Sequence, residues 1–245
     1  MRFDVFTIFP SMIEGYLDKG IIAKGYESGR IQVNIIDIRN FTEDLHRTTD
    51  DRPYGGGAGM VMKPEPIWQA INSVERFGKS LVVLLTPCGQ RFDQKKAWEF
   101  AGKDQILFIC GRYEGVDERI AELCVDIEIS IGDYVLSGGE LGALVIMDAV
   151  GRLIPGVLGD ENSAFEDSFE GNLLEYPHYT RPVVFKGISV PDVLLSGHHK
   201  EINRWRRTQS LKKTLKNRPD LLENAMLSDE DKQILYTLRK TEKTN

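Results

Sequence analysis

Residues 106–140 read ILFICGRYEGVDERIAELCVDIEISIGDYVLSGGE and contain two strand-like runs, each followed by a glycine-containing turn. The first run, 106–110, is continuously apolar, as expected of a strand buried on both faces. The second run, 125–131, alternates between apolar and polar residues. Ligands of open α/β sheets bind beyond the carboxyl ends of strands, where loops expose backbone N–H groups. The stretch therefore predicts two strand ends that face one pocket.

A third turn of the same kind precedes this stretch. Residues 86–89, Thr-Pro-Cys-Gly, follow the apolar run 81–85, which predicts another buried strand. Glycine lets a ligand approach the backbone closely, although a single glycine after a strand is an ordinary turn residue. Three such turns close together in the chain favour a binding site.

The rest of the first 155 residues alternates between expected strands and helices. Strands are expected at 2–9 and 31–38, with one helix between them that begins at Pro10. A polar stretch, 40–49, leads into a loop with four glycines at 55–59. Helices are expected at 64–77, 92–101 and 139–153. This alternation predicts an α/β fold with a mostly parallel sheet covered on both faces.

A change in composition separates two domains. Residues 1–156 form the α/β domain, and residues 157–176 are expected to be a flexible linker, because 159–175 holds six acids and no Lys or Arg. Residues 177–245 form a small all-α domain, with an irregular or extended start at 177–190. Its helices are expected at 197–217, 219–225 and 228–240.

Composition limits the class of protein. The 245 residues are 41% hydrophobic and 28% charged, and no apolar run is long enough for a membrane helix, so a cytoplasmic globular protein is expected. Cys88, Cys110 and Cys124 have no C-x-x-C spacing and are expected to be reduced. The net charge is −6, yet residues 178–218 have ten Lys or Arg against two acids, enough to attract a polyanion.

Familiar nucleotide and metal motifs are absent. Gly78-Lys79-Ser80 matches the end of a P-loop, but it precedes a strand and Ser73 stands where a glycine is needed. The glycines at 55–59 do not have the Rossmann spacing, and the histidines lack zinc-hydrolase spacing. The pair of most interest is Arg152, at the end of an expected helix, and Asp167, in the acidic linker.

At these residues the sequence closely resembles the bacterial tRNA (guanine-N1)-methyltransferases, the TrmD family. Ala58 stands where many members have proline, a departure that does not touch the chemistry. The matching stretches extend over nearly the whole chain and are 52–60, 110–119, 131–140, 152–158, 166–169, 177–182 and 195–199.

The resemblance implies the SPOUT architecture, in which the end of the α/β domain forms a trefoil knot. It also implies a homodimer with active sites at the subunit interface and S-adenosylmethionine bound by the three strand-end turns. The residues that would bind it are Leu85, Pro87, Gly89, Gly111, Tyr113, Glu114, Ile131, Gly132, Asp133, Tyr134, Val135, Leu136, Gly138 and Gly139. Whether Mg²⁺ takes part, held by Glu114, is left open.

The resemblance further implies methyl transfer to N1 of guanosine 37 of tRNA, next to the anticodon. Asp167 would be the general base and Arg152 would stabilise O6, roles that fit a nucleophile that must lose a proton. The residues expected to contact tRNA are Tyr54, Gly57, Ser168, Arg181, His198, Lys200, Arg204 and Arg207.

Two alternatives fit the same sequence less well. Another knotted methyltransferase would act on a ribose or a different base, and would methylate RNA that lacks the guanosine. A non-catalytic RNA-binding protein would bind tRNA with a steep salt dependence and transfer nothing. The presence of both Arg152 and Asp167 argues against the second alternative.

Overall fold

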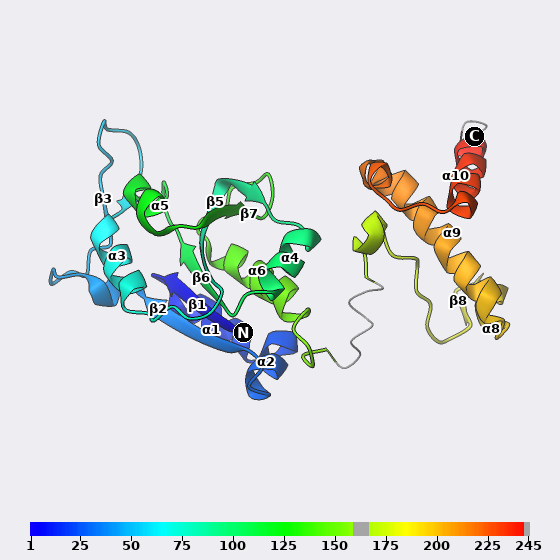
Figure 1. The fold of residues 1–245 in the computed structure, drawn as a ribbon, viewed down its shortest axis with the longest axis horizontal. Coiled ribbons are helices and arrows are strands. Elements are labelled where there is room, and N and C mark those ends of the chain that lie inside the picture. Colours follow the sequence, from blue (N-terminus) through cyan, green and yellow to red (C-terminus); the bar gives the residue numbers. More distant parts are fainter. Residues whose placement is uncertain (159–166, 243–245) are drawn as a thin grey trace. The chain divides into compact units, whose positions relative to one another are not determined.

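The computed structural model describes residues 1–158 and 167–242, and the chain divides into two compact units, Met1–Glu161 and Asn162–Asn245 (Figure 1). The first unit contains a five-stranded sheet in the order β2-β1-β6-β5-β7, and every neighbouring pair is parallel. This confirms the predicted parallel α/β architecture. The strands are β1 Arg2–Thr7, β2 Gln32–Asp37, β5 Ser80–Arg91, β6 Gln105–Cys110 and β7 Ile127–Ser130.

Helices cover both faces of this sheet (Figure 1). One layer consists of α1 Pro10–Leu17, α2 Gly20–Glu27, α4 Gln94–Ala101 and α6 Glu140–Gly151. The other consists of α3 Pro64–Asn72, α5 Glu118–Cys124 and the short 3₁₀ helix η1 Ile38–Phe41.

The continuous apolar character of β6 follows from this arrangement. Leu107 and Ile109 belong to the core beneath α3 and α5, with Ile67 and Ile120 from those helices. The alternate residue Phe108 is equally buried on the side of α6. Because successive strand residues point to opposite faces, a strand covered on both sides carries no polar residues in its middle.

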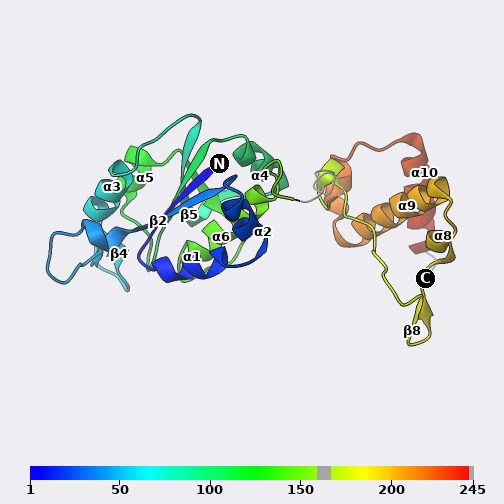
Figure 2. The same ribbon diagram turned by 90° about the horizontal axis from the view of Figure 1, so that it is seen from below.

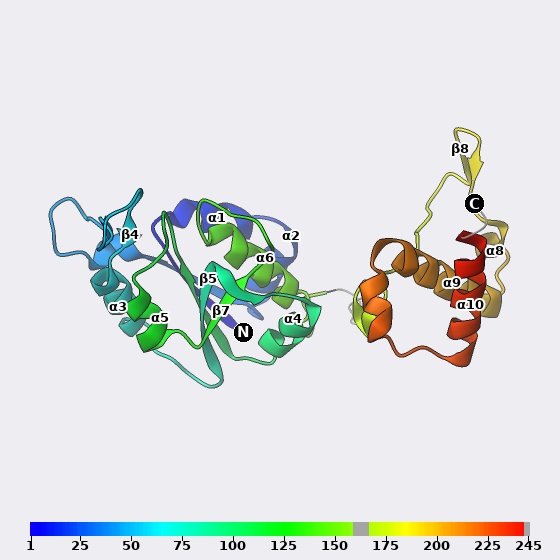
Figure 3. The same ribbon diagram turned by 90° about the horizontal axis from the view of Figure 1, so that it is seen from above.

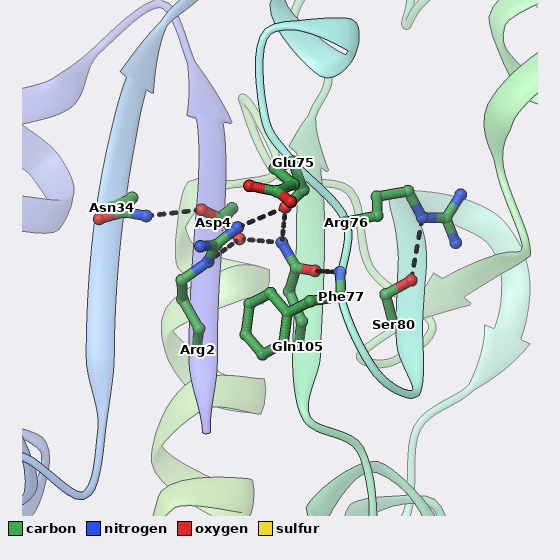
Figure 4. Close-up of polar contacts among 8 residues, drawn as sticks. All are labelled: Arg2, Asp4, Asn34, Glu75, Arg76, Phe77, Ser80 and Gln105. Atoms are coloured by element: carbon green, nitrogen blue, oxygen red, sulfur yellow. Dashed lines mark hydrogen bonds and ion pairs between the residues drawn. The ribbon is translucent and has the colours of Figure 1, made fainter.

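A buried polar cluster joins the strands at their amino-terminal ends, the edge opposite the loops (Figure 4). Asp4 on β1 is fully buried and accepts hydrogen bonds from Arg2 Nε at 2.9 Å, Asn34 Nδ2 at 2.8 Å and Gln105 Nε2 at 2.7 Å. Gln105 Oε1 in turn accepts from the backbone N–H of Phe77 at 3.0 Å. These bonds satisfy the buried polar groups and link β1 with both of its neighbours, β2 and β6.

Some elements differ from the sequence expectation. The single helix expected after Pro10 is two helices, because the chain leaves helical geometry between them: Lys19 is extended, with a φ of −147°, and Gly20 has a φ of +89°. Helix α5 was not predicted, although Asp117 caps it by accepting from Arg119 N. Two short antiparallel strands, β3 Asp50–Asp51 and β4 Val61–Met62, flank the glycine loop.

The second unit is mainly helical around a small apolar core. Leu173, Leu211, Leu222 and Leu235 form this core. A two-stranded hairpin is also present, so the expectation of an all-α domain is not confirmed. The elements are η2 Glu170–Asn172, β8 Val184–Phe185, β9 Ile188–Ser189, α8 Asp192–Leu195, α9 His199–Asn217, η3 Pro219–Glu223 and α10 Asp229–Glu242.

The expected linker, 157–176, is only partly described, since residues 159–166 lie outside the described residues. Its later part is packed against α9. Leu173 is buried, the N–H of Leu174 donates to Thr214 Oγ1 at 2.8 Å, and Ser210 Oγ donates to the carbonyl of Leu174 at 2.5 Å. These contacts make the end of the expected linker part of the second unit. No described helix has the length and apolar character needed to span a membrane.

Candidate active site

Residues 84–88 of β5 and the loops after β6 and β7 surround a cavity of about 410 Å³ at the carboxyl edge of the sheet. Strand β5 contributes in an unexpected way. Leu85 and Gln90 both pair with Ile129 of β7, so residues 86–89 leave the sheet as a bulge and the strand then resumes. The bulge forms one wall of the cavity, which includes Thr86, Pro87 and Cys88.

Most of the residues expected to bind the methyl donor line this cavity. Those that line it are Leu85, Pro87, Gly111, Tyr113, Glu114, Ile131, Gly132, Tyr134, Val135, Leu136, Gly138 and Gly139. Gly89 and Asp133 do not. Gly89 serves packing instead, because a Cβ there would lie 2.5 Å from the backbone carbon of Glu128.

The loop after β6 is tied to the glycine-rich segment. The N–H of Glu114 donates to the carbonyl of Met60 at 2.9 Å, and the N–H of Met62 donates to the carbonyl of Gly115 at 2.9 Å. Gly59 has a φ of +85°, and a Cβ on it would collide with the side chain of Glu114. The glycine segment therefore ends against the wall of the cavity. The expected tRNA contacts Tyr54 and Gly57 are exposed on this segment.

The loop after β7 lies directly against the loop after β6. The N–H of Gly139 donates to the carbonyl of Gly111 at 2.9 Å, and a Cβ on Gly139 would be 2.8 Å from Cys110 Cα. Tyr134 folds back over Gly132, and its hydroxyl donates to the carbonyl of Ile131 at 3.3 Å. Glycine is needed at 139 because the Cys110 backbone occupies the space of a side chain, and it is favoured at 132 because the φ there is +156°.

An ion pair that the sequence analysis did not identify borders the cavity. Arg112 Nη2 lies 3.0 Å from Glu140 Oε2, and Thr7 Oγ1 donates to Glu140 Oε1 at 2.6 Å. The Glu140 side chain is fully buried, and Glu140 is the first residue of α6. Burial, reinforced by the Glu140 carboxylate, raises the pKa of the Cys110 thiol well above its usual range, so this cysteine stays protonated.

The expected catalytic residues belong to different units. Arg152 follows α6, where its N–H donates to the carbonyl of Asp148 at 3.1 Å, and its side chain is half-buried. Asp167 is half-buried in the second unit. The next residue, Ser168, accepts from the N–H of Glu175 at 3.0 Å through its hydroxyl, which helps to fold this segment onto the unit.

The other expected tRNA contacts lie along and before α9 and differ in how they are held. Arg181, His198 and Lys200 are exposed. Arg204 pairs with Glu230 across the exposed surface at 3.1 Å. Arg207 donates two hydrogen bonds, of 2.9 and 2.8 Å, to the buried carboxylate of Asp231, so it also joins α9 to α10.

A family model described as tRNA (Guanine-1)-methyltransferase TrmD matches residues 1–224. The chain belongs to this family. Curated relatives bear the name tRNA (guanine-N(1)-)-methyltransferase. The protein of Dictyoglomus turgidum is 53% identical over 240 residues, which cover 98% of this chain and 97% of the relative. That of Carboxydothermus hydrogenoformans is 55% identical over 236 residues, covering 96% and 93% respectively.

Membership of the TrmD family confirms the resemblance drawn from the motifs. Two of the matching stretches, 110–119 and 131–140, are the loops that enclose much of the cavity. A third, 52–60, is joined to the first by the bond from Glu114 N–H to Met60. Within the described part of the chain, no group of three or more His, Cys, Asp or Glu side chains is placed to hold a metal ion.

Proposed function

We propose that the protein transfers a methyl group from S-adenosylmethionine to N1 of guanosine 37 in tRNA, when another guanosine precedes it. The observation that carries the proposal is a cavity built from the bulge of β5 and the loops after β6 and β7, in a chain that belongs to the TrmD family. The names of the relatives support the reaction type and the tRNA substrate. Such a reaction places the protein in the cytoplasm.

The cavity fits a methyl donor of nucleoside size. Its volume of about 410 Å³ lies within the range usual for small-molecule sites, roughly 300–1,000 Å³. Glycines 111, 132, 138 and 139 lie on its wall, and atoms of Arg112 and Cys110 occupy the space of a side chain at 138 and 139, so these glycines let the loops pack closely around a ligand. Leu85 and Ile131 offer an apolar surface, and Glu114 a carboxylate. Bound there, S-adenosylmethionine would supply an electrophilic methyl group on a sulfonium.

The proposed acid–base chemistry needs one carboxylate and one guanidinium. Guanine N1 carries a proton at neutral pH, so Asp167 would take that proton as the N1–methyl bond forms and the methyl–sulfur bond of the donor breaks, leaving S-adenosylhomocysteine as a neutral thioether. Negative charge that spreads to O6 during this loss is stabilised by Arg152.

The proposed assembly follows the family. We propose that the bulge of β5 at 86–89 and the loops after β6 and β7 form a trefoil knot and that two copies form a homodimer with active sites at their interface. The hydrogen bond from the Gly139 N–H to the carbonyl of Gly111 supports the knot, because it holds the loop after β7 closely against the loop after β6. Residues 159–166 would join the two domains and bring Asp167 to the site when tRNA binds.

The second unit would hold the anticodon arm through phosphate contacts. The exposed cations Lys200, Lys212 and Lys213 lie on α9, and Arg181 lies upstream of it. Such contacts fix the position of the RNA without reading its sequence. N1 lies on the Watson–Crick edge, so the target base must leave its stack to reach the donor.

The test is single-turnover transfer of labelled methyl to two tRNA transcripts, with guanosine or adenosine at position 37. We expect label on N1 of the guanosine transcript alone, and a loss of at least about 100-fold in Asp167→Ala, as general bases contribute about 10²–10⁴-fold. Binding of S-adenosylmethionine to the variant should be unchanged. Addition of EDTA tests whether a divalent ion takes part.

Other outcomes would contradict specific parts of the proposal. Label on both transcripts would refute the target, and undiminished transfer by Asp167→Ala would refute the base. Tight tRNA binding by the wild type without any transfer would support a binding protein instead.

A further inference from the structure

The hairpin of the second unit has a well-defined turn. Strands β8 and β9 pair Val184 with Ser189 and Phe185 with Ile188. The two turn residues, Lys186 and Gly187, have φ values of 49° and 81°, the left-handed conformation that tight two-residue hairpins need. Directly paired residues of an antiparallel ribbon share a face, so Phe185 and Ile188 form one apolar surface and Val184 lies on the other face.

This apolar surface is open to solvent. Phe185 is 63% exposed and Ile188 is 74% exposed. The hairpin extends away from α9 and α10 of its own unit (Figures 2 and 3). A two-stranded ribbon is only marginally stable alone in water, and clustered exposed apolar side chains indicate a contact surface. The hairpin therefore has the character of a contact element.

The charges around the hairpin indicate the chemistry of its partner. Residues 177–191 contain Arg181 and Lys186 and no Asp or Glu. Lys186 Nζ lies 5.7 Å from the centre of the Phe185 ring. An aromatic ring beside a cation, without a carboxylate, suits single-stranded nucleic acid, because a base stacks on the ring and its phosphate pairs with the cation.

We propose that Phe185 and Ile188 form a stacking platform for an unpaired base of the RNA substrate, with Lys186 contacting an adjacent phosphate. The inference rests on the proposed function, which supplies the RNA. The platform positions the RNA and takes no part in the methyl-transfer step. Its loss therefore weakens RNA binding while the rate at saturating tRNA stays the same.

The test measures the dissociation constant of the full-length protein for the guanosine-37 transcript over a range of salt, with S-adenosylhomocysteine present. We expect Phe185→Ala to raise it about tenfold, as for loss of one stacked base, with an unchanged salt dependence. Phe185→Trp should bind at least as well as the wild type. Lys186→Gln should lower the slope of log K against log salt by about one.

Val184→Ala is the matched control, because it removes another exposed apolar side chain, 53% exposed against 63% for Phe185, from the opposite face of the same ribbon. Its dissociation constant should stay within about twofold of the wild-type value, a change that is small compared with the effect of losing a stacked base. Equal losses in Val184→Ala and Phe185→Ala would overturn the platform. So would a change in oligomeric state of Phe185→Ala with unaltered RNA affinity, which would assign the surface to a second copy of the chain.

The same experiments separate this inference from the proposed function. If the wild-type protein methylates the transcript and Phe185→Ala binds the transcript as tightly as the wild type does, the stacking platform is refuted and the proposed function stands. Wild-type protein that binds the transcript without methylating it contradicts the reaction, and a loss of binding in Phe185→Ala then still supports the platform.

Discussion

Arg112 and Glu140 form an ion pair, 3.0 Å between Nη2 and Oε2, that joins the end of β6 to the start of α6. Thr7 at the end of β1 holds the other carboxylate oxygen, and the Arg112 guanidinium also lies 4.5 Å from the centre of the Phe9 ring. The backbone of Arg112 pairs with Gly138 in the loop after β7. The pair therefore fixes the cavity wall to two strands and a helix at once.

The first prediction is that Glu140→Ala destabilises the protein by about 3 kcal/mol, because removal of one partner leaves the largely buried Arg112 without its counter-charge. Urea unfolding measures this change. Affinity for S-adenosylmethionine, by calorimetry on the folded variant, should fall at least about tenfold as the loop that carries Gly138 loses its support.

The control for this variant is Arg119→Gln, which breaks an exposed ion pair with Asp117 in the same unit. Solvent screens such pairs, so the midpoint of unfolding should stay unchanged. A Glu140→Ala variant as stable as Arg119→Gln would show that the buried pair contributes nothing to the fold.

The second prediction is that Gly139→Ala lowers affinity for S-adenosylmethionine at least about tenfold while the protein remains folded. The added methyl would lie 2.8 Å from Cys110 Cα and 3.0 Å from Leu85 Cβ, so one loop must move away from the other. Gly15→Ala is the comparison, since nothing lies within 4 Å of a Cβ there. Equal affinity in the two variants would contradict the close packing of the loops.

The third prediction concerns the cysteines. Cys88 is exposed on the cavity wall, whereas Cys110 is buried and its pKa is raised. Because the thiolate is the reactive form, iodoacetamide should alkylate Cys88 in the native protein and leave Cys110 intact. Mass spectrometry of digests measures both, and S-adenosylmethionine should slow the reaction at Cys88. Alkylation of Cys88 at the same rate with and without the donor would place the ligand elsewhere.

The fourth prediction is that the free energy of unfolding of the second unit falls at acid pH. Hydrogen bonds from Arg207 lower the pKa of Asp231 from 3.8 to about 2. A folded-state pKa below the unfolded value stabilises the protein above about pH 4, and this contribution is lost as the pH falls towards 2. Unfolding monitored by circular dichroism should show about 2 kcal/mol lost over this range, and Asp231→Asn should remove most of that dependence.

The comparison for Asp231→Asn is Asp229→Asn, two residues away on the same helix, where the carboxylate is exposed and pairs with Lys232. It should leave the acid dependence intact. Arg207→Ala should destabilise the unit as well as weaken RNA binding, so only an exposed cation such as Lys200 reports on RNA contact alone. If Asp229→Asn flattened the acid dependence as much as Asp231→Asn, the effect would come from general surface charge.

The sheet and the cavity loops could be predicted because their signals are local. Strand-like runs followed by glycines marked the ends of β6 and β7 and the place where β5 leaves the sheet. The bulge of β5 at 86–89 could not be predicted, since the strand resumes through pairing with β7. The hairpin at Lys186-Gly187 did have a local signal, a two-residue turn with glycine between strand formers, which sequence reasoning passed over.

The polar contacts of the site could not be predicted from the sequence, for a different reason. Glu140 lies 133 residues from Thr7 and 28 from Arg112 along the chain. No spacing rule connects such residues, because their meeting depends on the order of strands and not on a local period. The same holds for the bonds that join Asp4 to Asn34 and Gln105.

The strand order also determines how the chain is made. β1 and β2 pair as soon as both have been synthesised, but the other edge of β1 pairs with β6, which ends at Cys110. At roughly 5–20 residues per second, a ribosome needs about 4–15 seconds to bridge that gap. During this time an apolar strand edge stays open on the nascent chain. The first forty residues should therefore be a site where chaperones engage the protein during translation.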